Sequence, residues 1–125
     1  MTLEERVALL EAQVRLLLKA GQGNDPAIVS ALAKMTSKMH GALQCVLLGQ
    51  SNADIAERFD VTESTAKVYV RSVAMKLGVK TRSEIVSKTM KTFEGLTDAE
   101  YLELSGGVPK TWGSSGEKWN YGADE

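Results

Sequence analysis

The chain opens with apolar residues spaced alternately four and three positions apart. Residues 2–20 contain no Gly or Pro, and the recurring apolar positions are Leu3, Val7, Leu10, Val14 and Leu17. Valine at a and leucine at d positions form a heptad repeat that favours a parallel two-stranded coiled coil. In this register Arg6 at g can pair with Glu11 at the next e position of a second chain. The pattern predicts a homodimerisation helix over residues 1–20. The alternative is a helix packed on its own domain, because further leucines (Leu9, Leu16 and Leu18) widen the apolar stripe.

Residues 21–34 are predicted to form a linker and a short helix. Gly21 to Asn24 end the first helix, and Asp25-Pro26 supplies an N-cap followed by proline at the first helical position. Apolar residues then recur at helical spacing, and Thr36 gives a second cap signal before the apolar stretch around Leu43 to Leu48. The pattern leaves open whether this region is one helix or two.

The next part of the chain carries regular helix-start signals. Three pairs fit the capping box, namely Ser51 with Asp54, Thr81 with Glu84, and Thr97 with Glu100. Thr62 is a further N-cap candidate, and Gly49 and Gly78 stand where glycine would end a helix. These signals, with almost no β pattern, predict an all-α fold. Helices over 51–59 and 62–77 have the spacing of a helix-turn-helix.

The predicted helix over residues 62–77 has two contrasting faces. One stripe is apolar and suited to a core: Ala66, Tyr69, Val70, Val73 and Leu77. Another stripe carries Ser64, Lys67, Val68, Arg71 and Met75. Lys67 and Arg71 lie one turn apart and have the reach to contact guanine O6 and N7 in a major groove. Taken alone, a charged stripe of this kind is more often a solvated helix face than a DNA-binding face.

The charge distribution adds to this picture. The 125 residues carry a net charge of only -1, yet residues 64–91 contain seven basic residues against the single acidic Glu84. Such a segment can neutralise phosphates. Residues 92–125 carry seven acidic and two basic residues.

The acidic end of the chain is predicted to be an extended tail with one short helix over 98–104. It contains Gly and Ser around three aromatic residues, Trp112, Trp119 and Tyr121. These aromatic residues are candidate anchors for a protein partner such as RNA polymerase. The alternative is that they pack back on the domain.

Several classes of protein are not supported by the sequence. Charged residues interrupt every apolar run well before the roughly 20 residues that span a bilayer, and residues 2–6 do not resemble a secretory signal. The single Cys45 is expected to be a small buried residue, as in a reducing cytoplasm. His40, the only histidine, has no neighbouring cysteine or carboxylate cluster and is expected at the surface. We therefore predict no enzyme activity, metal site, cofactor or small-molecule ligand.

Three blocks of sequence together identify a family resemblance: Gly49 to Ala56, Thr65 to Tyr69, and Lys76 to Arg82. Residues from about 35 to 90 resemble a LuxR-type (GerE-like) helix-turn-helix DNA-binding domain. The resemblance implies a four-helix domain whose third helix enters the major groove of double-stranded DNA and whose fourth often mediates dimer contact. Together with the heptad pattern and the composition of the tail, it gives an all-α fold class: a coiled-coil helix, this domain over 35–91, and an extended tail over 92–125.

The resemblance also implies roles for individual residues. Lys67, Val68 and Arg71 would face bases, with Ser64 at the edge of the groove. Candidates for phosphate contact, or for bracing the turn, are Ser51, Asn52, Thr65 and Lys76. Ser51 and Asn52 stand at a predicted helix N-terminus, where free amides attract phosphate, although capping alone explains Ser51 equally well.

Some positions depart from the family pattern. Lys38, Met39 and Gly41 stand where the first helix usually has an Arg-Glu pair and a later Glu, and Ala53 replaces a usual Lys. The 34 residues before the domain are too few for the family's receiver or ligand-binding domain, so no switch of that kind is expected.

The sequence therefore favours a cytoplasmic, homodimeric, sequence-specific transcription regulator. Two alternatives remain: a protein-interaction adaptor that uses the aromatic tail, and an architectural DNA-packaging protein. For the adaptor, removal of residues 106–125 is expected to abolish partner binding while DNA affinity stays.

Overall fold

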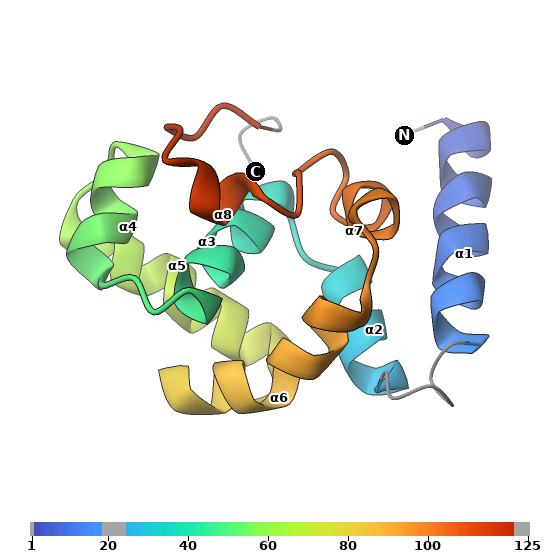
Figure 1. The fold of residues 1–125 in the computed structure, drawn as a ribbon, viewed down its shortest axis with the longest axis horizontal. Coiled ribbons are helices and arrows are strands. Elements are labelled where there is room, and N and C mark those ends of the chain that lie inside the picture. Colours follow the sequence, from blue (N-terminus) through green and yellow to red (C-terminus); the bar gives the residue numbers. More distant parts are fainter. Residues whose placement is uncertain (1, 19–24, 122–125) are drawn as a thin grey trace.

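The computed structural model describes residues 2–18 and 25–121, with side chains for 2–11 and 25–121. The described residues form eight α-helices and no strand, as the all-α prediction requires (Figure 1). The helices are α1 (Leu3–Leu18), α2 (Pro26–Ala33), α3 (Ser37–Leu47), α4 (Asn52–Phe59), α5 (Glu63–Leu77), α6 (Arg82–Gly95), α7 (Asp98–Leu104) and α8 (Trp112–Ser115). None of the described helices is long and apolar enough to cross a membrane.

The local signals in the sequence fix where most helices begin. All three predicted capping boxes are present, at Ser51, Thr81 and Thr97. The side chain of Thr36 accepts a hydrogen bond from the Met39 amide and separates α2 from α3, so this region is two helices. Each cap satisfies backbone amides that have no partner within the helix.

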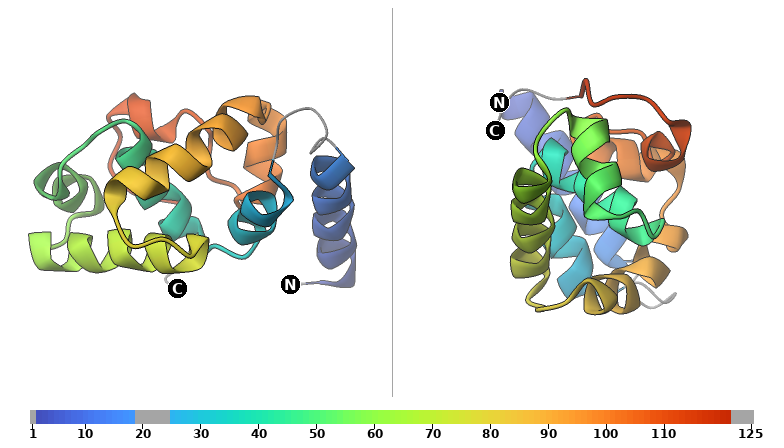
Figure 2. Two further views of the ribbon diagram at one scale, coloured as in Figure 1. Left: turned by 90° about the horizontal axis from the view of Figure 1, so that it is seen from below. Right: turned by 90° about the vertical axis from the view of Figure 1, so that its left-hand side faces the viewer.

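The core lies between α2, α3, α5 and α6, with α7 and α8 closing it on one side. The left-hand view of Figure 2 shows α6 crossing in front of α3, with α5 alongside. Fully buried residues come from every helix from α2 to α8, among them Leu32, Leu43, Ile55, Val73, Ile85, Tyr101 and Trp112. Cys45 is buried, as predicted.

The surface position predicted for His40 is wrong. This side chain is fully buried, with Nε2 lying 2.8 Å from the Leu32 carbonyl oxygen and Nδ1 lying 2.8 Å from the Tyr101 hydroxyl. A carbonyl oxygen only accepts, so Nε2 carries the proton and the Tyr101 hydroxyl donates to Nδ1. Burial lowers the pKa of His40 to about 4, which keeps the ring neutral. His40 thus connects α2 to α7 through the core.

The C-terminal segment (residues 108–121) is packed against the domain instead of extending from it. Trp112 is 1% exposed, and Trp119 stacks on Phe59 with ring centroids 4.9 Å apart. Tyr121 lies edge-on to Trp119. Of the two alternatives for these aromatic residues, packing on the domain is therefore the one observed. Removal of residues 106–125 would also remove part of the core, so it cannot separate partner binding from DNA binding.

The segment also explains why α3 has glycine at position 41. A Cβ atom there would lie 2.5 Å from the Trp119 ring and 3.0 Å from the Phe59 ring. A larger side chain, such as the glutamate that the resemblance implies at this position, would displace the tryptophan. Glycine at position 41 thus leaves the space that Trp119 of the C-terminal segment fills.

Candidate nucleic-acid interface

Helix α5 begins and ends at signals that the sequence contains. The Thr62 hydroxyl accepts a hydrogen bond from the Thr65 amide, and the acidic Glu63 in the first turn is favourable beside the positive end of the helix dipole. Gly78 ends the helix with a φ of 72°, a left-handed conformation that glycine adopts without strain. One stripe of α5 is buried against the core: Ala66, Val73, Ala74 and Leu77.

The opposite stripe of α5 is open to solvent. The four residues predicted to contact bases, Ser64, Lys67, Val68 and Arg71, are all exposed. Val68 is 52% exposed, and Met75 one turn past Arg71 is 73% exposed. The structure thus brings the predicted residues together on one helix face with both cations available. Helix α5 itself lies on the other side of the molecule from α8 (Figure 2, right).

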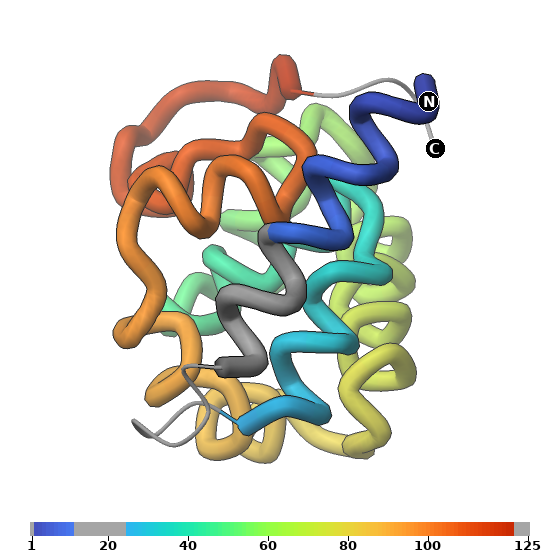
Figure 3. Tube along the Cα trace, turned by 90° about the vertical axis from the view of Figure 1, so that its right-hand side faces the viewer, coloured from blue at the N-terminus to red at the C-terminus, as the bar shows by residue number. Residues whose placement is uncertain are grey.

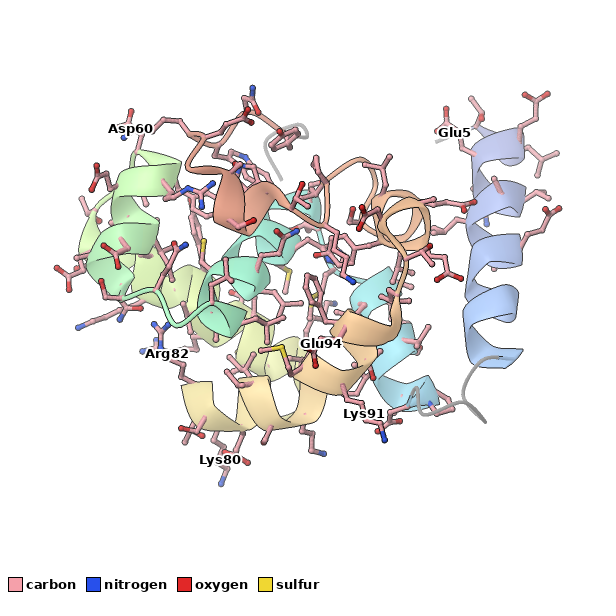
Figure 4. All side chains as sticks on the ribbon, in the orientation of Figure 1. Glu5, Asp60, Lys80, Arg82, Lys91 and Glu94 are labelled. Carbon is pink, nitrogen blue, oxygen red and sulfur yellow. The ribbon has the colours of Figure 1, made fainter. Side chains whose placement is uncertain are left out.

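A groove with several cations runs beside this face. It has a cavity volume of about 240 Å³ and is lined from α4, α5 and the start of α6. Its polar lining residues are Asn52, Lys67, Arg71, Lys80, Thr81 and Arg82. Figure 4 shows Lys80 and Arg82 at this end of the molecule, near the first turn of α6. The sequence indicated Lys80 and Arg82 only as general positive charge, because their proximity to Arg71 depends on how α6 packs against α5. The groove is suited in charge to a phosphate backbone.

Three of the four predicted phosphate-contact residues already have partners in the described structure. Ser51 caps α4, and the Thr65 hydroxyl accepts a hydrogen bond from Thr62. The Asn52 side chain accepts from Arg82, which also donates to the Gln50 carbonyl oxygen at 2.8 Å. These contacts tie Ser51 and Thr65 to the starts of their own helices, and Asn52 to the start of α6. Lys76 is exposed at the end of α5.

The predicted dimerisation helix α1 lies across α2 and α7 (Figure 3). Leu3, Val7 and Leu10 are 74%, 44% and 58% exposed, whereas Leu9 is half-buried beside a cavity of about 420 Å³ between α1 and the domain. Val14 and Leu17 lie outside the side chains that the structure describes. The described part of the heptad stripe therefore faces away from its own domain.

The described residues contain no group of three or more His, Cys, Asp or Glu side chains placed to hold a metal ion. The interface is instead built from cations, hydroxyls and Val68. This composition is suited to a nucleic acid: the cations and hydroxyls can hydrogen-bond to phosphates and base edges, and Val68 can make an apolar contact.

Comparison with known proteins agrees with this geometry. Residues 33–89 match the family described as bacterial regulatory proteins, luxR family. Over 62 residues the chain is 37% identical to the HTH-type transcriptional activator RamA of Corynebacterium glutamicum, a match that covers 50% of this chain and 22% of that protein. The chain thus spans about a fifth of that relative's length. No solved structure matches the chain. Residues 33–89 are a helix-turn-helix domain of the luxR family, a family of regulatory proteins and not of enzymes.

Proposed function

We propose that the protein is a sequence-specific, double-stranded DNA-binding transcription regulator that acts as a homodimer. The observation that carries the proposal is the exposed face of α5, where Lys67 and Arg71 stand one turn apart in a luxR-type domain. The similarity to a transcriptional activator supports the same kind of function. The protein would act in the cytoplasm, where bacterial DNA lies.

In the proposed complex, α5 lies in the major groove. Lys67 and Arg71 donate hydrogen bonds to guanine O6 and N7, the commonest specific protein–DNA contact, and Val68 packs against a thymine methyl group. Lys80 and Lys76 stand near the flanking phosphates. Arg82 holds Asn52 and the Gln50 carbonyl in place, so that the start of α4 keeps its position beside the same groove.

The first test is substitution of Lys67→Ala and Arg71→Ala. Each variant is expected to bind a specific duplex more weakly by roughly 1–3 kcal/mol, which is about 5–150-fold. Binding to several duplexes is measured by fluorescence anisotropy at fixed salt, and the preference among bases at one position should relax. Lys34→Ala removes an exposed cation at the end of α2, outside the basic segment 64–91, and is the matched control. Unchanged affinity in both Lys67→Ala and Arg71→Ala would refute the base-contact assignment.

The homodimer is proposed to form through α1. The described seam residues Leu3, Val7 and Leu10 are exposed in the single chain, and a second copy of the same helix would cover them. Arg6 and Glu11 are also exposed, as required for charge pairing between parallel copies. A symmetric dimer would present two α5 helices to two half-sites.

Two neighbouring leucines provide a matched test of this dimer. Leu10→Ala is expected to raise the dimer dissociation constant tenfold or more, because each dimer loses two buried leucines and about 1.4 kcal/mol already corresponds to tenfold. Leu9→Ala removes the same atoms from the side of α1 that faces α2 and α7 and should leave the dissociation constant nearly unchanged. Analytical ultracentrifugation measures both. A monomeric wild-type protein, or a larger effect at Leu9, would favour a helix packed only on its own domain.

A further inference from the structure

The C-terminal segment lies outside the residues that match the luxR family, yet it is attached closely to the first helix of the helix-turn-helix. The attachment is centred on Arg58, in the last turn of α4. The Arg58 guanidinium lies over the Trp112 ring, with Cζ 4.0 Å from the ring centroid. It also donates to three backbone carbonyls of the segment, so its position is fixed by several contacts at once.

The Arg58 guanidinium donates hydrogen bonds to backbone carbonyl groups in α8 and just after it. Nη1 donates to Gly113 O at 2.7 Å, Nη2 donates to Trp112 O at 2.8 Å, and Glu117 O accepts from both Nη2 and Nε, at 2.7 and 2.9 Å. Trp112 O also accepts from the Ser115 hydroxyl, and Gly113 O also accepts from the Gln50 side-chain amide, so Arg58 adds to the contacts that hold this short helix. A lysine has one nitrogen and cannot reproduce this fork of donors.

The segment in turn satisfies carbonyl groups at the end of α4. The Trp119 amide donates to Arg58 O at 2.8 Å, and the Lys118 ammonium donates to Glu57 O at 2.8 Å. These are among the last four carbonyls of α4, which have no partner within that helix. Helix α4 and the C-terminal segment therefore cap each other's carbonyl groups.

Aromatic contacts continue from the C-terminal segment to α5, the helix proposed to lie in the major groove. Trp119 stacks on Phe59 at the end of α4, and Phe59 makes an edge contact with Tyr69 of α5, with centroids 5.3 Å apart. Tyr69 directly follows Val68, one of the proposed base contacts. Displacement of Trp119 would thus remove a stacking partner from Phe59, the α4 residue that contacts Tyr69 of α5.

Helix α4 has eight residues and is held from outside at both ends. Arg82 holds the start through Gln50 O and Asn52, and the C-terminal segment holds the end. We infer that the C-terminal segment, acting through Arg58, is a positioning element for DNA binding: it fixes the placement of α4 and α5 that base contact requires. This inference rests on the proposed function. It assigns Arg58 as a positioning residue that reaches the base-contacting face only through α4.

The test is Arg58→Lys, which keeps the positive charge but not the fork of donors. We expect specific affinity to fall about tenfold, while nonspecific affinity and its salt dependence stay unchanged, because the number of cations is the same. Amide hydrogen exchange in α4 and at the start of α5 should accelerate at least tenfold at a temperature where circular dichroism shows a folded protein. Lys34→Arg, which keeps the charge at an exposed position at the end of α2, is the control and should change neither quantity.

A second variant, Trp119→Ala, removes the stacking contact without changing charge. It is expected to accelerate exchange in the same amides and to lower specific affinity, which covers the case in which Arg58→Lys does not fold. Unchanged exchange in α4, or accelerated exchange with full specificity, would overturn the inference. Absence of specific binding by the wild-type protein would instead refute the proposed function, and the exchange measurement would still report whether the segment holds α4.

Discussion

Trp112→Ala is expected to destabilise the protein by about 3–5 kcal/mol, the range for removal of a buried tryptophan or phenylalanine from a core. The ring is 1% exposed and contacts Phe59, Trp119 and the Arg58 guanidinium. Because a domain of ordinary stability has only about 5–15 kcal/mol in total, the variant should lose a large share of its free energy of unfolding. Urea denaturation followed by circular dichroism measures the change.

Two control variants test whether the loss of stability comes from burial of the Trp112 ring. Met75→Ala shortens a side chain that is 73% exposed and should alter stability by no more than about 0.5 kcal/mol. Trp112→Phe retains an aromatic ring and removes the indole Nε1, a buried group with no hydrogen-bond partner among the described residues, so it should be much milder than alanine. A Trp112→Ala loss below about 1 kcal/mol would show that the C-terminal segment is not part of the core.

Stability is also expected to fall steeply with acid because of His40. Its pKa is 6.5 in a free chain and about 4 in the folded protein, where burial disfavours the charged ring. Between pH 6.5 and 4 the unfolded state therefore binds a proton at His40 that the folded state does not bind. The contribution of neutral, buried His40 to the free energy of unfolding is fully present above pH 6.5 and is lost progressively as the pH falls from 6.5 to 4. The loss is about 3 kcal/mol, since one pKa unit corresponds to about 1.4 kcal/mol.

His40→Gln isolates this effect from the carboxylates, which titrate in both proteins. Glutamine retains a donor and an acceptor for Leu32 O and the Tyr101 hydroxyl but does not titrate. Between pH 7 and 4 the variant should lose about 3 kcal/mol less stability than the wild type, whatever its stability at pH 7. Parallel pH curves for the two proteins would mean that folding leaves the pKa of His40 unchanged.

The sequence predicted those parts of the structure that local chemistry determines. Capping residues such as Ser51, Thr62 and Thr81 determine helix starts through contacts within four residues, so they could be read in sequence order. The exposed face of α5 followed from helical periodicity alone. The motif-based resemblance then placed the helix-turn-helix within the residues that match the luxR family.

The features that were missed depend on contacts between distant segments. His40 is buried because Leu32 and Tyr101 supply both its hydrogen-bond partners, and Tyr101 is 61 residues away. No local pattern in the sequence points to Arg58, because its acceptors are backbone carbonyls 54 to 59 residues later. One signal was present in the sequence: glycine inside a predicted helix, at position 41, often marks close approach of another group.

The most direct measurement is selection of bound duplexes from a random library by the full chain at near-physiological salt, where nonspecific phosphate binding is weak. The proposed function predicts enrichment of two inverted half-sites about one helical turn apart, because a symmetric dimer presents two copies of α5. Salt-sensitive binding without any enriched sequence would contradict sequence-specific regulation and favour an architectural protein. No binding to any duplex would contradict a DNA-binding function for the exposed face of α5.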